Sequence, residues 1–401
     1  MNLTSGLPFW LIKDGLPFNY PALNHSIKTD VAIIGGGISA ALTSHYLLKA
    51  GIECTVIDKR SIGLGSTCAS TSLLQYEIDT ALHQLVHKRG YKDAVRAYTL
   101  CSQSVDQLLS IARTIKFTDI QPKKSLYYAA KKKDIDFLKQ EYAIRHANGF
   151  GVQWMEAQDI RHSYGFDAPA AILSDQAAET DAYAFTHALF QHGIKKGLNV
   201  YDRTNISAVK RHRDGFTLIA NGAHSIKARK IIYATGYEIV ELIDKKIVDL
   251  KSTYALISEH QQPMEGYWKE DALIWNTAAP YLYMRTTTDK RVIVGGRDED
   301  FMNAIRRDKL IKRKTGQLVK DFHQLFPGTK LQPAFSWTGT FGSTADGLPF
   351  IGTYDKKPGC FFSLGFGGNG ITFSVIAARI ITDLLLGKAN KDAQLFSFKR
   401  V

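Results

Sequence analysis

The chain has 401 residues, of which 45% are hydrophobic and 22% charged, a composition typical of a globular protein and not of a disordered or fibrous one. Lysine and arginine outnumber aspartate and glutamate by 51 to 38, so the formal net charge is +13. The sequence has no secretory leader pattern, no apolar stretch of membrane-spanning length and no closely spaced cysteines, so we predict a cytoplasmic protein without a membrane span, metal site or disulfide framework.

The first predicted elements are a strand, a helix and a strand. Residues 31–34 and 54–57 are short apolar runs, and the segment 38–49 between them has helical periodicity. Glycines with the spacing G-x-G-x-x-A follow the first run, and an acid closes the second. This order predicts a βαβ unit that binds a dinucleotide, with its pyrophosphate at the helix N-terminus and its ribose on the acid. The motif residues are Gly35, Gly37, Ala40 and Asp58.

The next segments favour FAD over NAD. Residues 61–75 (SIGLGSTCASTSLLQ) form a loop of small and hydroxyl-bearing residues, whereas a nicotinamide dehydrogenase more often continues into another helix and strand. Strand-like runs at 206–212, 216–220 and 224–227 are separated by Asp-Gly and Asn-Gly pairs, which predicts a β-meander. A further apolar strand, 230–238, contains Thr235 and Gly236 near its end.

The remaining chain alternates between helix and strand. We predict a helix at 94–115, a strand at 126–130, a strand-rich block at 251–297 and a helical stretch at 303–326. The densest basic run, RRDKLIKRK, lies in that last helix and is interpreted as its solvated face, so we do not expect a nucleic-acid partner.

The last segment repeats the order of strand, glycine turn and helix. GFGGNG at 365–370 opens a helix with apolar residues at helical spacing, and the helix ends before Gly387. Its N-terminal amides could face the pyrimidine part of a flavin, where negative charge accumulates on reduction. A glycine-rich connection made only for packing is the alternative that this segment alone leaves open.

Together these segments resemble the D-amino-acid oxidase and glycine oxidase superfamily of FAD-dependent oxidoreductases, which includes sarcosine and gamma-glutamylputrescine oxidases. The resemblance extends over essentially the whole chain, and WTGTFGSTADGLPFIG and GFGGNGITFS are its most specific segments. DVAIIGGGISAA, VIDKRSIGLGST, IIYATGY and PYLYMRTTTDKRVIVGG also carry it.

The resemblance implies a fold and a domain division. We expect an α/β protein whose Rossmann-like FAD-binding domain is joined to an α+β substrate domain built on an antiparallel sheet. The FAD-binding domain should comprise residues 1–90, 150–250 and 330–401, and the substrate-binding domain residues 91–149 and 251–329.

The resemblance also implies the cofactor-binding residues. The adenosine and pyrophosphate side should include the βαβ motif, and the flavin ring should lie near Gln75 and the glycine turn of the last helix. The full set is Gly35, Gly37, Ile38, Ser39, Ala40, Asp58, Lys59, Gly65, Ser66, Thr67, Ser70, Thr71, Gln75, Ile206, Thr235, Gly236, Gly367, Gly368, Asn369, Gly370 and Ile371.

Two departures from the family pattern concern the substrate and the flavin attachment. Glycine oxidase has arginines that bind the substrate carboxylate where this chain has Phe341 and Gly368, so a simple amino acid is less expected as substrate. No cysteine stands near WTGTFGST, and Cys360 begins a strand, so we expect non-covalent FAD.

The substrate pocket is predicted from the strand PYLYMRT. Tyr281, Tyr283 and Arg285 alternate with apolar residues and share one face, where the tyrosines could flank an amine and the arginine could bind an anion. A structural ion pair for the arginine and ordinary sheet positions for the tyrosines remain the alternative. Further aromatic walls are proposed at Tyr254, Trp337 and Phe341.

The resulting functional prediction is an FAD-dependent oxidase or dehydrogenase. It should oxidise a C–N bond of an amine or N-substituted amino acid by hydride transfer to flavin N5, giving an imine that water hydrolyses. Its partners should be a small-molecule amine and an electron acceptor, either O₂ or a quinone. A flavin-dependent tRNA-modifying enzyme and a non-catalytic flavin-binding subunit remain alternatives.

Overall fold

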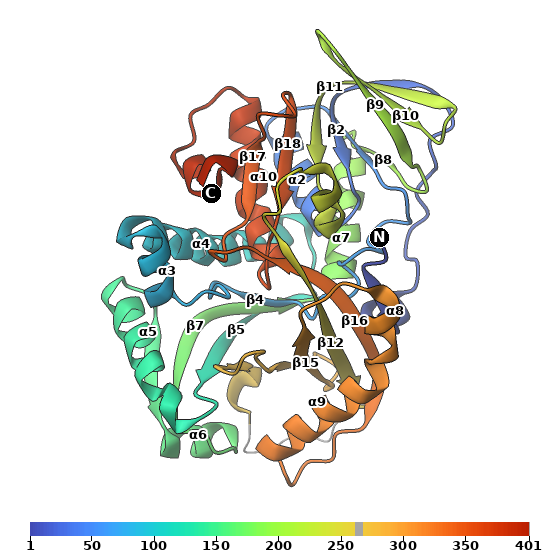
Figure 1. Cartoon of the computed structure of the whole chain (residues 1–401). Helices are drawn as coiled ribbons and strands as arrows, with labels where there is room; N and C mark the ends of the chain where they lie inside the picture. Colours follow the sequence, from blue (N-terminus) through green and yellow to red (C-terminus); the bar gives the residue numbers. More distant parts are fainter. Residues whose placement is uncertain (261–267, 401) are drawn as a thin grey trace.

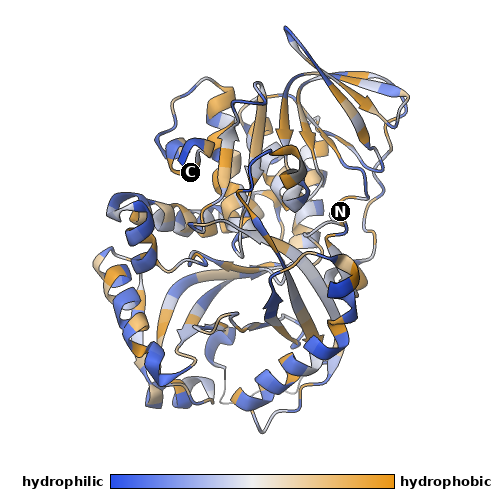
Figure 2. Cartoon of the chain, in the orientation of Figure 1, coloured by the Kyte–Doolittle hydropathy of each residue, from blue (hydrophilic) through white to orange (hydrophobic). Residues whose placement is uncertain are grey.

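The computed structural model describes residues 1–260 and 268–400, whose strands form two sheets. In Figure 1 the smaller sheet occupies the upper part of the molecule and the larger sheet the lower part. Figure 2 shows apolar residues concentrated on the strands and inner helices, and polar residues on the outer helices. The expected α/β architecture with an antiparallel second sheet is therefore present.

The smaller sheet has eight strands among the described residues and is mostly parallel. Such strands are buried on both faces and read as continuous apolar runs, as in the wholly buried Cys54–Ile57. Its order is β17 (Phe350–Thr353), β18 (Cys360–Leu364), β11 (His224–Tyr233), β2 (Ile27–Ile34), β3 (Cys54–Ile57) and β8 (Asn199–Tyr201), with β10 (Gly215–Ala220) and β9 (Ile206–His212) extending from β11.

The meander differs from the sequence prediction in one respect. Two separate strands were expected at 224–227 and 230–238, but β11 runs without interruption from His224 to Tyr233. Its first half pairs antiparallel with β10, and the strand also pairs in parallel with β2 along most of its length. One strand thereby joins the meander to the parallel sheet.

The larger sheet has ten strands among the described residues, and its pairs are antiparallel except for β13 with β5. Its order is β1 (Thr4–Gly6), β16 (Pro333–Ser343), β12 (Asp249–Ser258), β15 (Val292–Glu299), β14 (Tyr283–Thr286), β13 (Leu273–Asn276), β5 (Ile120–Tyr128), β7 (Ala170–Thr180) and β4 (Leu73–Gln75), with β6 (Val152–Glu156) beside β7.

Helices pack against both sheets. Against the smaller sheet, α2 (Ile38–Lys49) packs on α7 (Ala182–Ile194) and α10 (Gly370–Leu385). Under the larger sheet, the apolar stripe of α9 (Ile311–Leu325) buries Leu318 and Phe322 (Figure 1). The remaining helices are α1 (Phe9–Asp14), α3 (Leu82–Arg89), α4 (Tyr91–Ile115), α5 (Ile135–Ala147), α6 (Ala157–Tyr164) and α8 (Ala304–Lys309).

Sheet membership does not follow the predicted domain segments throughout. Strands β1, β4, β6, β7 and β16 belong to the larger sheet, although the sequence placed them within the FAD-binding segments. The chain therefore crosses between the two sheets more often than the predicted division requires. The domain ranges themselves stay a prediction.

The N-terminal segment is attached to the junction of the two sheets. Strand β1 pairs with β16, and the indole N–H of Trp10 in α1 donates a hydrogen bond to the Ser70 carbonyl at 2.7 Å. Among the described residues, no helix has both the length and the apolar character required to cross a membrane.

Candidate active site

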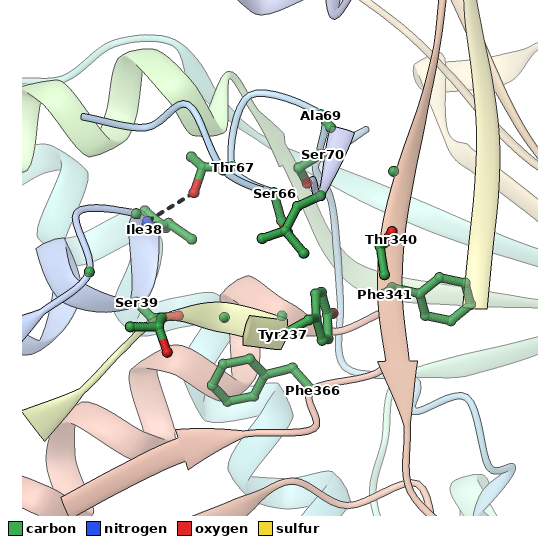
Figure 3. Close-up of a pocket in the computed structure, with 18 of the residues that line it drawn as sticks. Ile38, Ser39, Ser66, Thr67, Ala69, Ser70, Tyr237, Thr340, Phe341 and Phe366 are labelled. Carbon is green, nitrogen blue, oxygen red and sulfur yellow. Dashed lines mark hydrogen bonds between the residues drawn. The ribbon is translucent and has the colours of Figure 1, made fainter. Parts of the chain in front are cut away.

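A cavity of about 700 Å³ lies where the two sheets meet. It is lined by the glycine turn before α2, the glycine turn before α10, the loop 65–72 and the cavity-facing strands of the larger sheet. Figure 3 shows Ile38 and Thr67 on one side of this cavity and β16, with Thr340 and Phe341 on opposite sides of the strand, on another. Glycine turns from both ends of the sequence thus line one space.

The first glycine turn is fixed by close backbone contacts and by an acid. Gly35 has φ +114°, and a Cβ there would lie 2.3 Å from the Ala234 carbonyl oxygen, so only glycine fits. The Asp58 carboxylate accepts hydrogen bonds from the backbone N–H groups of Gly36 at 2.6 Å and Arg60 at 2.7 Å. Burial raises the pKa of Asp58. This acid therefore organises the turn as well as facing the cavity.

The N-terminus of α2 offers the donors that a pyrophosphate requires. The Ile38 N–H donates to the Thr67 hydroxyl at 3.1 Å (Figure 3), and a Cβ at Gly37 would lie 2.9 Å from that same oxygen. The buried hydroxyls of Ser66 and Thr235 line the cavity and have no hydrogen-bond partner among the described residues. Orphaned hydroxyls beside a helix N-terminus fit the phosphate part of a dinucleotide.

A charged cluster lies at the same end of the cavity. Glu238 pairs with Arg60 at 2.6 Å, with Lys59 at 3.0 Å and with the amino group of Met1 at 3.1 Å. Burial alone would raise the pKa of Glu238, but hydrogen bonds from Arg60, Lys59 and Met1 lower it to about 2. These cations are thus held in place by an internal acid.

The second glycine turn, before α10, is held against α2 and against β4. Ser374 in α10 shares a hydrogen bond of 2.6 Å with Ser39 in α2, which joins the two helix N-terminal regions. The Asn369 side-chain amide donates to the carbonyls of Gln75 at 3.2 Å and Glu77 at 2.8 Å. The amides at the start of α10 are therefore positioned beside the cavity, as the glycine-turn interpretation requires.

All of the predicted cofactor residues except Ala40 line this cavity. Ala40 is fully buried in the apolar core, where its small side chain lets α2 pack closely. Contact of the other residues with a cofactor stays a prediction.

On the larger sheet, aromatic side chains form the wall of the cavity. Tyr281, Tyr283, Trp275, Trp337 and Phe341 line it, and the Trp337 indole donates to the Ala69 carbonyl at 2.8 Å. The Tyr283 ring lies directly over β15, since a Cβ at position 295 would come within 2.3 Å of it. Burial raises the pKa of Tyr283 to about 12 and that of Tyr281 further, so both hydroxyls stay protonated near neutral pH.

Two predicted pocket residues lie elsewhere, and both expectations are corrected. Arg285 is 2% exposed, pairs with Glu179 at 2.9 Å and donates to the carbonyls of Thr71 and Thr180, so it is a structural ion-pair partner and not an anion site. Tyr254 is buried in the core beneath the sheet, and its hydroxyl donates to the Arg307 carbonyl at 3.3 Å.

Several lining residues were not predicted from the sequence. Trp275 had only the signal of an aromatic in a strand-like run, and Tyr237 and Phe366 adjoin motifs that were recognised. Two acids, Asp79 and Asp298, carried no motif signal because each simply follows a strand or stands near the end of one. The residues missed in this way are Asp79, Tyr237, Trp275, Asp298 and Phe366.

Comparison with known proteins identifies the family. The family model described as FAD dependent oxidoreductase matches residues 30–384, most of the chain. The chain belongs to the FAD-dependent oxidoreductase family. The resemblance stated from the sequence is thereby confirmed, and FAD, the cofactor of this family, fits the glycine turns, helix N-termini and orphaned hydroxyls of the cavity.

This FAD-dependent oxidoreductase is also similar to individual relatives and to a solved structure. It is 24% identical to the glycine oxidase of Geobacillus kaustophilus, with 93% of this chain and 97% of that protein aligned. It is 22% identical to the gamma-glutamylputrescine oxidoreductase of Escherichia coli, covering 93% and 87%. The crystal structure of the Geobacillus kaustophilus glycine oxidase superposes with a TM-score of 0.77 at 18% identity, covering 94% and 100%, which confirms the predicted fold.

Proposed function

We propose that this FAD-dependent oxidoreductase oxidises the C–N bond of an amine or an N-substituted amino acid. When bound, FAD supplies the hydride acceptor at N5, and the imine product is hydrolysed by water. The observation that carries the proposal is that Tyr281, Tyr283, Trp337 and Phe341 line the same cavity as the glycine turn of α10. The names of the relatives, a glycine oxidase and a gamma-glutamylputrescine oxidoreductase, support the same reaction class.

The chain's own residues would bind and orient the amine. An aromatic wall excludes water and favours the neutral amine over the ammonium form, and a neutral nitrogen is the form from which hydride leaves. The Tyr281 and Tyr283 hydroxyls stay protonated and can each donate or accept a hydrogen bond. The N–H groups at the start of α10 provide the positive end of a helix dipole, which would stabilise negative charge on the ring.

We also propose that the FAD is held without a covalent bond. None of the four cysteines lines the cavity, and all four are buried. Cys68 lies within the loop 65–72 but does not itself line the cavity, and burial raises the pKa of its thiol to about 12, so the reactive thiolate is suppressed. Denaturation with acid should therefore release all of the flavin into the supernatant.

The test is anaerobic reduction of the purified yellow protein. Primary and secondary amines, diamines and N-methyl amino acids are added in turn while the flavin absorbance is followed. Bleaching by at least one amine supports the proposal. If dithionite bleaches the flavin but no amine does, a non-catalytic flavin-binding role is favoured instead. Reoxidation of the reduced protein by O₂ or by a soluble quinone then distinguishes oxidase from dehydrogenase.

A role in tRNA modification is not favoured by the basic run of α8 and α9. Arg307 is fully buried and donates to the Asn2 carbonyl and the Thr340 hydroxyl. Lys314 is also buried, pairs with Glu299 and donates to the Arg297 carbonyl at 2.8 Å. Arg307 and Lys314 therefore stabilise the fold and do not belong to a basic surface that could bind RNA. Absence of salt-dependent gel retardation of tRNA would support this interpretation.

A further inference from the structure

Two carboxylates line the aromatic end of the cavity without a cation of their own. Asp79 lies in the chain after β4, and Asp298 lies near the end of β15; both line the cavity. Neither side chain forms an ion pair with any residue in the ranges 1–260 and 268–400. The Oδ1 atom of Asp298 is buried and lacks a hydrogen-bond partner within the same ranges. Asp298 is half-buried and Asp79 is exposed, so both carboxylates are accessible from the cavity, and the orphaned Oδ1 atom of Asp298 points to a ligand there.

A β-bulge directs Asp298 to the cavity. Between two paired positions, β12 advances two residues, from Ser252 to Tyr254, while β15 advances three, from Gly296 to Glu299. Within the bulge, Arg297 has φ +58° and donates to Asp321 of α9 at 2.7 Å, on the outer side of the sheet. The next residue, Asp298, lines the cavity on the inner side. Bulges of this kind commonly re-aim a side chain beside an active site.

The glycine turn of α10 leaves space for the second carboxylate. Asp79 accepts hydrogen bonds from the Gly368 N–H at 2.8 Å and from the Tyr281 hydroxyl at 3.2 Å. A Cβ at position 368 would lie 2.8 Å from the Asp79 carboxylate and 2.9 Å from the Tyr281 hydroxyl, and one at Gly367 would lie 2.4 Å from Asp79. A longer side chain at position 368 would therefore displace this acid. Because Gly367 and Gly368 have no side chains, the Asp79 carboxylate can lie against the turn.

The neighbouring cations are engaged by other acids. Lys251, whose position on β12 pairs with Phe341, binds Asp300 at 2.8 Å, and Lys314 binds Glu299. Burial raises the pKa of Asp298 to about 6, and the Asp79 carboxylate acts in the same direction, against a hydrogen bond from Thr253 and the charges of the two lysines. Burial likewise raises the pKa of Asp79. With Lys251 and Lys314 engaged by Asp300 and Glu299, the two carboxylates give the aromatic end of the cavity an acidic lining.

The aromatic rings add a second feature that suits a cation. The Tyr281 and Tyr283 ring centroids lie 5.7 Å apart, and Trp275 stands edge-on to Tyr281 at 6.1 Å. Ring faces of this kind attract ammonium and guanidinium groups, more strongly when water is excluded. Carboxylates and aromatic faces together bind an organic cation and repel a carboxylate.

We propose that the substrate carries a second, cationic group, an ammonium or a guanidinium, which binds between Asp298 and Asp79 against Tyr281 and Tyr283. This inference rests on the proposed amine oxidation and names its substrate class. The reacting nitrogen is then neutral and lies beside the flavin, while the distant charge selects the substrate. Asp298 is a specificity residue, and no proton transfer to it is required.

The test compares 1,4-diaminobutane with n-butylamine and glycine as reductants of the purified holoprotein under anaerobic conditions. We expect the diamine to have the highest ratio of reduction rate to Kd, exceeding that of n-butylamine by about tenfold or more. One charge-assisted hydrogen bond changes an affinity by about that factor. Asp298→Asn should remove this preference by weakening the diamine alone, and Asp298→Glu should restore part of it. Asp167→Asn, a change at an exposed residue, is the matched control. The flavin spectrum and the Tm verify that each variant is folded.

Each other outcome overturns a defined part of the proposal. If glycine or n-butylamine reduces the flavin as efficiently as the diamine, the cationic subsite is wrong while amine oxidation stands. Equal slowing of n-butylamine and the diamine in Asp298→Asn would make Asp298 a general positioning group, which also overturns the subsite. If no amine reduces the flavin, the proposed reaction fails, and titration of the flavin spectrum with 1,4-diaminobutane against acetate still tests the subsite. Tighter binding of acetate, or no difference, would refute it.

Discussion

Replacement of Asp58 by alanine tests the description of the dinucleotide end. The carboxylate accepts two backbone hydrogen bonds, of 2.6 Å from Gly36 and 2.7 Å from Arg60, and it lines the cavity where a ribose is expected. A hydrogen bond to a charged group contributes about 1.5–3 kcal/mol, so loss of one such contact to FAD raises its Kd by about 10- to 150-fold. Loss of the two backbone contacts loosens the turn and acts in the same direction.

The assay is calorimetric or fluorescence titration of the apoprotein with FAD. Asp58→Asn should have a smaller effect than Asp58→Ala, because the amide oxygen still accepts one of the two hydrogen bonds. Asp30→Ala serves as the control, since Asp30 is a partly exposed acid on β2 that pairs with the exposed Arg229 at 3.4 Å. A Kd for Asp58→Ala within twofold of the wild-type value, at unchanged Tm, would refute the role assigned to this acid.

Three further predictions concern stability. Gly35→Ala combines a left-handed φ with a 2.3 Å overlap on a backbone carbonyl, and it should lower the free energy of unfolding by more than about 2 kcal/mol, measured by urea denaturation. Arg285→Met removes the nearer of two cations from buried Glu179, since Lys123 remains 3.5 Å away, and should cost less than the about 3–5 kcal/mol expected for a buried charge left with no cation. The kcat/KM of the folded holoprotein should stay within about threefold, and a selective loss of kcat/KM would restore Arg285 to the substrate site. Glu141 in α5 is buried and pairs with Arg145 at 2.6 Å. Burial would raise the pKa of Glu141, but the Arg145 charge and hydrogen bonds from His83 and Leu82 lower it from 4.5 to about 2, so its stabilisation of about 3 kcal/mol is present above about pH 4.5 and lost as the pH falls towards 2. Glu141→Gln should flatten that part of the pH profile, and an unchanged profile would contradict this assignment.

The parts of the site predicted best are those specified by local spacing. The turn at Gly35, the βαβ unit and the glycine turn before α10 each depend on residues close together in sequence, so the pattern alone indicates the geometry. The convergence of the two turns on one cavity followed from the family resemblance and not from any local pattern.

The substrate side was predicted less well because the face to which a strand residue points, and the length of the strand, depend on how the strands pair and pack. Tyr281 and Tyr283 of PYLYMRT line the cavity, but β14 continues beyond it, where Arg285 meets Glu179. Tyr254 faces α9 because of its pairing with Gly296, which no sequence pattern reveals. Asp298 reaches the cavity only through a bulge, and bulges have no reliable sequence signal.

The hydrogen bond between Ser39 and Ser374 has a consequence for how the protein is made in the cell. The two halves of the nucleotide cradle are separated by 335 positions along the chain. A growing polypeptide therefore cannot enclose its prosthetic group until α10 has left the ribosome. Loading must follow translation, and a message truncated shortly before α10 yields a product that cannot become yellow.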